Sequence, residues 1–312
     1  MYTITTTDFF GIEKIKLLNP RSGEYLAVIP AFGGNLNELA LLKDGKLHSI
    51  IAGDETLESL SGNTTNFYRG AKLSPFPNRI NRGKYEFGGK EYQLETNAPP
   101  HALHGLCWNL PFAVKEQLAT NSSAKLVLTA VYKSLHKGYP FTYQIEIEYV
   151  LEQSNFKCTT RIANKCEQPI PIGDGWHPYF TTGSKTNNLK IQLPQGAKQL
   201  ELSESLIPTG NYLQRNQFSS PTLLYTTQLD HCFELDKTDG IVETRLLDQS
   251  KNICIVIWQQ GYGFIQAYTP PDRQSIAIEP MTCAPDAFNN KNGLIILKPK
   301  ESAEFCFGVR LE

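Results

Sequence analysis

The sequence predicts an all-β protein, a large antiparallel β-sandwich with few short helices. Three observations lead to this fold class. Apolar and polar residues alternate with a period of two in several segments, turn residues recur at short intervals between these segments, and long helical patterns are absent. Many strands with few helices are typical of a sandwich or barrel, in which sheet faces bury one another.

The predicted elements follow one another along the chain. Residues 54–60 (DETLESL) are the one modest helix candidate. Residues 84–94 (KYEFGGKEYQL) predict a β-hairpin, because Gly88 and Gly89 can take the positive φ that a two-residue turn requires. In residues 143–149 (YQIEIEY), tyrosine and isoleucine share one face while glutamine and glutamate share the other. Further strands are expected at residues 125–132, 252–258, 275–280 and 303–311.

Composition limits the possible classes of protein. The chain has 312 residues, enough to bury a large core without disulfides or metal. We expect a single domain over residues 1–312, because no repeat, low-complexity tract or Pro/Ser-rich linker interrupts it. The 30 basic and 31 acidic residues give a net charge of −1, so neither nucleic acid nor an anionic membrane is expected as a partner.

Cysteine usage and the first residues indicate the compartment. The seven cysteines are odd in number and form no C-x-x-C pair, which favours reduced thiols in a reducing environment. The N-terminal residues show no secretory signal, and no stretch approaches the roughly 18 apolar residues of a membrane span. We therefore expect a cytoplasmic protein.

Polar side chains flank the predicted hairpin. Asn78 and Arg79 precede it, and His101 and His104 follow it. The outer ends of a hairpin lie close together, so Arg79 and one histidine can face the same pocket. Arginine suits a site that grips hydroxyl oxygens, because it offers five donors in one plane. The alternative is that these are ordinary turn residues.

Two further segments place ionisable residues beside apolar ones. His177 lies among aromatic residues in GDGWHPYF, a setting that suits a sugar or, alternatively, a buried structural histidine. Glu279 ends an apolar run in QSIAIEP, where it is either a buried carboxylate with a raised pKa or a strand end that emerges into solvent. Asp230 and His231 in LDHCF, and Gln266 in GFIQAYTP, are weaker signals.

Six motifs occur in one order over most of the chain: NRI, HALHG, HPYF, DHCF, QAYT and EP followed by PDAFN. In this order the sequence resembles the aldose 1-epimerase (galactose mutarotase) family. The resemblance implies the galactose mutarotase-like supersandwich fold. It also implies an isomerase that interconverts the α and β anomers of an aldose, in carbohydrate metabolism.

The resemblance also implies a role for each matching residue. Glu279 matches the catalytic base and His177 the catalytic acid. The residues that match sugar-binding positions are Asn78, Arg79, His104, Asp230 and Gln266. His101 is interpreted as structural. No metal or organic cofactor is expected, the partner is a small sugar, and the protein is expected to be a monomer or homodimer.

Three alternatives stay open at this point. A non-catalytic carbohydrate-binding protein of the same fold accounts equally for Arg79 and the aromatic residues. A metal-dependent sugar enzyme can draw ligands from the four histidines 101, 104, 177 and 231. Glycoside hydrolysis by paired carboxylates can use Glu279 with Asp230.

Overall fold

The fold is all-β, as predicted, and the strands of the described residues form three large antiparallel sheets and three small ones. The computed structural model describes residues 1–62, 67–213, 217–236 and 240–312. Within these residues only two short α-helices occur, α1 (Leu57–Ser61) and α2 (Ala287–Asn290), with two 3-10 turns, η1 (Asn81–Gly83) and η2 (Thr186–Asn188).

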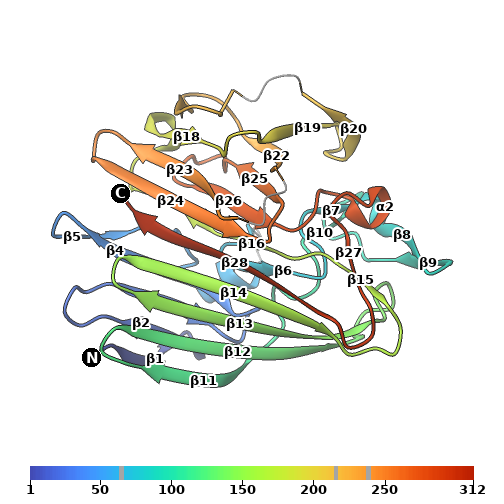
Figure 1. The fold of residues 1–312 in the computed structure, drawn as a ribbon, viewed down its shortest axis with the longest axis horizontal. Helices are drawn as coiled ribbons and strands as arrows, with labels where there is room; N and C mark the ends of the chain where they lie inside the picture. Colours follow the sequence, from blue (N-terminus) through green and yellow to red (C-terminus); the bar gives the residue numbers. More distant parts are fainter. Residues whose placement is uncertain (63–66, 214–216, 237–239) are drawn as a thin grey trace.

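The largest sheet has nine strands, most of which Figure 1 shows side by side in the foreground. In order across the sheet they are β11 (Ala113–Ala119), β12 (Ser123–Lys133), β13 (Thr142–Glu152), β14 (Asn155–Asn164), β28 (Ser302–Leu311), β24 (Ile253–Gln260), β23 (Val242–Asp248), β18 (Lys190–Gln192) and β21 (Thr222–Leu223). Strand β28 thus joins segments that are far apart in the sequence.

Two further sheets complete the sandwich. The eight-stranded sheet contains β20 (Pro208–Tyr212), β19 (Lys198–Leu202), β22 (Asp230–Glu234), β25 (Phe264–Tyr268), β26 (Ile276–Met281), β16 (Gly175–His177) and β6 (Ala71–Leu73), with β17 (Tyr179–Phe180) also paired to β26. The five-stranded sheet runs in chain order through β1 (Thr3–Phe9), β2 (Ile12–Leu18), β3 (Tyr25–Ile29), β4 (Asn35–Lys43) and β5 (Lys46–Ser49).

Three strand pairs stand apart from these sheets: β7 (Arg79–Ile80) with β10 (Ala102–Leu103), β8 (Lys84–Phe87) with β9 (Lys90–Gln93), and β15 (Ile170–Ile172) with β27 (Ile295–Leu297). The β8–β9 pair is the predicted hairpin. Gly88 and Gly89 form its turn with φ values of 60° and 73°, which glycine adopts without strain. The predicted helix is α1, a single turn capped by Thr56.

The period-two pattern places the core as expected. Along β13, Tyr143, Ile145, Ile147 and Tyr149 are fully buried, while the residues between them are partly exposed. One buried hydrophobic cluster includes side chains from the nine-, eight- and five-stranded sheets. All seven cysteines are free thiols. No helix in the described ranges is long and apolar enough to cross a membrane.

Candidate active site

All seven side chains selected from the sequence line one pocket of about 230 Å³, which we call the Glu279 pocket. They come from strands β7, β16, β22, β25 and β26 and from the residues next to β7 and β10. The fold thus brings together residues that lie far apart in the sequence, from Asn78 to Glu279. The complete lining is Phe67, Tyr68, Asn78, Arg79, Leu103, His104, His177, Tyr179, Asp230, Gln266, Tyr268 and Glu279.

Glu279 is a buried carboxyl group in the interior of a sheet. All six residues of β26 are buried, and Glu279 is only 1% exposed. β26 lies between β25 and β16, and Gln266 of β25 is the partner of Glu279 in the pairing register. The strand therefore does not carry Glu279 out into solvent, and its carboxyl group needs partners inside the pocket.

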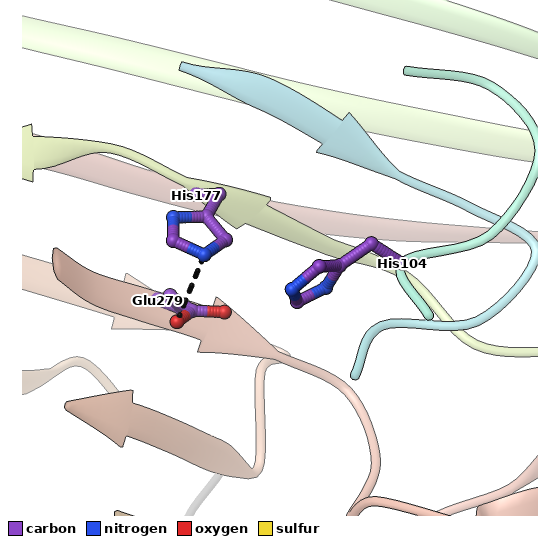
Figure 2. Close-up of side chains that lie close together, drawn as sticks. All are labelled: His104, His177 and Glu279. Carbon is purple, nitrogen blue, oxygen red and sulfur yellow. Dashed lines mark ion pairs between the residues drawn. The ribbon is translucent and has the colours of Figure 1, made fainter. Parts of the chain in front are cut away.

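His177 is the nearest ionisable partner of Glu279. Its Nε2 atom lies 3.3 Å from Oε1 of Glu279, and Figure 2 shows the two side chains facing each other. Burial lowers the pKa of His177 to about 3. Burial, with a smaller effect of the negative charge of Asp230, raises the pKa of Glu279 well above its usual value. The two shifts favour the uncharged form of the pair, a carboxylic acid beside a neutral imidazole, which holds one exchangeable proton.

His104 lies beside this pair as a neutral donor. It follows β10 with a left-handed φ of 62°, and its ring centroid is 5.0 Å from that of His177 (Figure 2). The backbone N–H of Asn78 donates to Nδ1 of His104 at 3.2 Å, so the hydrogen of the neutral ring is on Nε2. Burial lowers the pKa of His104 well below its usual value, which keeps the ring uncharged.

Arg79 and Asp230 are a second charged pair in the pocket. Nη2 of Arg79 lies 3.9 Å from Oδ2 of Asp230. Oδ1 of Asn78 accepts hydrogen bonds from the backbone N–H of Arg79 at 2.9 Å and from its Nη1 at 3.2 Å. β7 and β10 pair with Arg79 opposite Leu103, the residue before His104. The hairpin ends thus bring the guanidinium and His104 into one pocket.

Gln266 contacts Asp230 and is also the strand partner of Glu279, so it links the Arg79–Asp230 pair to the His177–Glu279 pair. Its Nε2 donates to Oδ1 of Asp230 at 2.5 Å. Among the described residues, three buried atoms of the pocket have no hydrogen-bond partner: Oε1 of Gln266, Nδ1 of His177 and Oε2 of Glu279. Buried polar atoms are nearly always paired, so these three atoms are available to form hydrogen bonds with water or with a polar ligand.

A buried ion pair supports the strand that carries His177. Lys72 of β6 lies opposite Trp176 of β16, and both are on the sheet face that points away from the pocket. Nζ of Lys72 binds Oδ1 of Asp174, and Tyr262 donates to the same oxygen at 3.0 Å. The side chains of Lys72 and Asp174 are both 0% exposed.

Aromatic residues form the rest of the lining. Tyr179 stacks on His177 with 5.0 Å between ring centroids, as the aromatic surroundings of His177 in the sequence suggested. Trp176 and Phe180 instead point into the core. Phe67 and Tyr68 were missed by sequence reasoning, because no periodic pattern or motif marks them. Tyr68 has a left-handed φ of 55° and accepts a hydrogen bond from Asn97.

Several residues singled out from the sequence lie elsewhere. His101 does not line the Glu279 pocket, and its Nδ1 accepts a hydrogen bond from the backbone N–H of Arg82 at 3.1 Å. His231 accepts one from the backbone N–H of Asp230 at 3.3 Å and also lies outside the lining.

Three residues of the pocket can in principle hold a metal ion. His104, His177 and Glu279 each offer one ligand atom, and these atoms lie within 4.8 Å of one another. Two histidines and one glutamate are a donor set that zinc accepts. Of the four histidines considered as ligands, only these two belong to the group. The expectation of a metal-independent site stays a prediction.

The sheets and the pocket define a galactose mutarotase-like β-sandwich protein. The structure of a galactose mutarotase-like protein from Clostridium acetobutylicum matches 100% of this chain and 98% of its own, with a TM-score of 0.88 and 20% identity. The structure of galactose 1-epimerase from Lactobacillus acidophilus matches 100% and 98%, with a TM-score of 0.81 and 16% identity. These likenesses establish the fold.

The chain belongs to the aldose 1-epimerase family, because the sequence model of that family, Aldose 1-epimerase, matches residues 14–308. The uncharacterized protein YihR of Escherichia coli is 28% identical over 92% of this chain and 91% of its own length. Maltose epimerase of Levilactobacillus brevis is 29% identical over 62% of this chain and 57% of its own length. The resemblance seen in the six motifs is therefore confirmed.

Proposed function

We propose that this protein is an aldose 1-epimerase (mutarotase) that interconverts the α and β anomers of an aldose, with Glu279 as base and His177 as acid. The observation that carries the proposal is the buried contact of 3.3 Å between these two side chains in a polar pocket. Membership of the family supports the reaction class.

The reaction requires two proton transfers at neighbouring oxygens of the sugar. Glu279 removes the proton of the anomeric hydroxyl group, and His177 protonates the ring oxygen as its bond to C1 breaks. The open-chain aldehyde then rotates about the C1–C2 bond. Ring closure on the other face reverses both transfers, so each group works in either protonation state.

The pair keeps one proton through the whole cycle. Before ring opening the active form is a carboxylate with an imidazolium, and after opening it is a carboxylic acid with a neutral imidazole. The opposite pKa shifts of Glu279 and His177 favour the uncharged one-proton form, a carboxylic acid with a neutral imidazole, and the contact of 3.3 Å lets the proton move within the pair to give the charged form. No external acid or base is needed, because the sugar returns the proton that it takes.

The remaining polar residues are proposed to hold the sugar. His104 donates from Nε2 toward the ring oxygen region, since Asn78 occupies its Nδ1. Arg79, Asp230 and Gln266 form a linked wall of donors and acceptors that suits hydroxyl groups. The ring of Tyr179 offers a face to the C–H surface of the sugar.

Polarimetry of freshly dissolved α-glucose and α-galactose tests the proposal. Wild-type protein is expected to accelerate mutarotation, and Glu279→Gln, which keeps the shape but not the base, should lower kcat by about a hundred to ten thousand fold. Glu86→Gln is a matched control, because Glu86 is exposed on β8 outside the Glu279 pocket.

The outcomes separate the candidate functions. A near-normal rate for Glu279→Gln contradicts the assignment of the base. Calorimetric binding of sugars without any acceleration by the wild type would instead establish the non-catalytic carbohydrate-binding protein. Release of products from glycosides would establish hydrolysis.

A further inference from the structure

The PDAFN motif, residues 285–289, has no part in the proposed mechanism. It leads into α2, and none of its residues lines the Glu279 pocket. Figure 1 shows α2 beside β7, the two-residue strand that begins with Arg79. The motif therefore lies next to the pocket without entering it, and its first charged residue, Asp286, contacts the β7 segment directly.

Asp286 forms two hydrogen bonds with the backbone of this segment. Its backbone N–H donates to the carbonyl oxygen of Arg79 at 2.6 Å, and its Oδ1 accepts from the backbone N–H of Asn81 at 2.8 Å. On the β10 side, the carbonyl oxygen of Asn78 accepts from the backbone N–H of His104. Alternate residues of an antiparallel strand direct their backbone groups to opposite sides. Asp286 thus closes the second edge of β7, as a neighbouring strand would.

The side chain of Asp286 does not cap the helix that it precedes. An aspartate at this position usually accepts a hydrogen bond from one of the first backbone N–H groups of the helix. Asp286 makes no such bond to α2 and has a left-handed φ of 60°. A residue other than glycine keeps this conformation where the surrounding contacts hold it. The bonds to Arg79 and Asn81 are such contacts.

Helix α2 gives Asp286 a fixed base. Phe288 is 1% exposed, and its ring centroid lies 4.9 Å from that of Tyr85. Nδ2 of Asn289 donates to the carbonyl oxygen of Lys84 at 2.9 Å and to Oδ1 of Asp286 at 2.6 Å. A strand of only two residues has few contacts of its own, so the position of β7 depends on this anchored neighbour.

The position of this backbone determines where the guanidinium of Arg79 lies. Nη1 donates to Oδ1 of Asn78, and Nη2 lies 3.9 Å from Oδ2 of Asp230. Side chains of a binding site must be held within about 0.5 Å of their working geometry. Asn78 and Asp230 orient the guanidinium, and Asp286 fixes the backbone from which it extends.

We propose that Asp286 is a positioning residue, which holds the backbone of Arg79 so that the guanidinium meets the hydroxyl groups of the sugar. This proposal rests on the proposed function, in which Arg79 binds these hydroxyl groups. Asp286 does not line the pocket and therefore acts through Arg79. Removal of its side chain should weaken sugar binding and leave the proton transfers at Glu279 and His177 intact.

Polarimetry of α-glucose and α-galactose with Asp286→Gly tests the proposal. Glycine adopts the left-handed φ without strain, so this variant removes only the side chain. KM should rise about threefold to tenfold, the contribution of one hydrogen bond, while kcat changes little. Asp286→Asn should keep KM close to that of the wild type, because the amide oxygen still accepts from the N–H of Asn81. Asp44→Gly is the matched control, since Asp44 is an exposed aspartate with a φ of 49° outside the pocket.

A double variant separates a positioning role from a general loss of stability. Arg79→Ala/Asp286→Gly should have the KM of Arg79→Ala alone, because Asp286 acts through Arg79. Partial unfolding would instead reduce the amount of active protein and hence the apparent kcat, at an unchanged KM. An unchanged KM in Asp286→Gly, an equal rise in Asp286→Asn, or losses that multiply in the double variant would overturn the proposal.

Calorimetric binding of glucose and galactose keeps this test separate from that of the proposed function. Absence of mutarotation with every sugar would contradict the proposed function. The same variants are then compared by Kd, for which the same ratios are expected, and equal Kd values for the wild type and Asp286→Gly would overturn the positioning role. A wild type that binds neither sugar would overturn it as well.

Discussion

His177 and Glu279 contact each other through one atom each and keep a second buried atom without a partner. Nε2 and Oε1 are 3.3 Å apart, while Nδ1 and Oε2 have no hydrogen bond among the described residues. An unpaired buried polar atom costs about 1–3 kcal/mol, so a ligand that pairs such atoms is bound more tightly. Under the proposed function, the pair exchanges a proton with the sugar and its two unpaired atoms accept or donate hydrogen bonds to the hydroxyl groups of the sugar.

Replacement of His177 by glutamine should lower kcat by about a hundred to ten thousand fold, because the amide cannot protonate the ring oxygen. KM should change little, since glutamine retains polar atoms in the pocket. Initial rates by polarimetry measure both constants. The Glu279→Gln/His177→Gln double variant should be scarcely slower than either single variant, because the two residues act as a unit. Fully multiplicative losses would contradict a shared proton.

Stability should depend on pH through the same pair. In the folded protein the two side chains together hold one titrating proton. In the unfolded chain the same two side chains hold two protons below the ordinary carboxyl pKa of 4.5 and none above the ordinary imidazole pKa of 6.5. The free energy of unfolding therefore rises with pH between about 3, the folded pKa of His177, and 4.5, is level between 4.5 and 6.5, and falls from 6.5 up to the raised pKa of Glu279. Each slope is about 1.4 kcal/mol per pH unit.

Urea denaturation of the wild type and of the double variant across this range checks the prediction. In the difference between the two free energies of unfolding, the contributions of all other titrating groups cancel. This difference should show both slopes and the level region. A difference that does not change with pH would contradict the one-proton state.

The ion pair of Lys72 and Asp174 gives a stability prediction. Lys72→Met should destabilise the protein by about 3–5 kcal/mol, because it leaves the carboxylate of Asp174 buried without its counter-charge. Lys72→Met/Asp174→Leu should recover most of this loss. Lys115→Met, which breaks an exposed pair with Glu146, should cost less than about 1 kcal/mol. Equal losses in both single variants would contradict the buried-pair argument.

Removal of metal should leave mutarotation unchanged. The proposed proton transfers need no Lewis acid, although His104, His177 and Glu279 can together hold a cation. Protein dialysed against a chelator and checked for zinc by elemental analysis should keep its full rate. Loss of activity that added zinc restores would contradict the acid–base mechanism.

Local patterns account for what the sequence could predict. The strict alternation of residues 143–149 specifies one buried face, and the paired glycines at 88 and 89 specify a tight turn. The seven selected side chains lie in recognisable motifs, and the structure brings them into one pocket. Each of these predictions rests on residues close together in the chain.

Long-range relationships account for what could not be predicted. Lys72 reads as a surface residue, and its burial depends on Asp174, about a hundred positions away. Phe67 and Tyr68 enter the pocket from a segment without strand or helix periodicity. The burial of Glu279 depends on its neighbours across the sheet, β25 and β16, which local sequence does not reveal.

The interior position of β28 has a consequence for synthesis on the ribosome. The β11–β14 part of the largest sheet and the part that begins with β24 meet only through this strand. Until residues 302–311 have left the exit tunnel, β14 and β24 each present an open strand edge that can pair with another chain or bind a chaperone. The largest sheet is thus completed only after β28 has been synthesised, however early its N-terminal strands assemble.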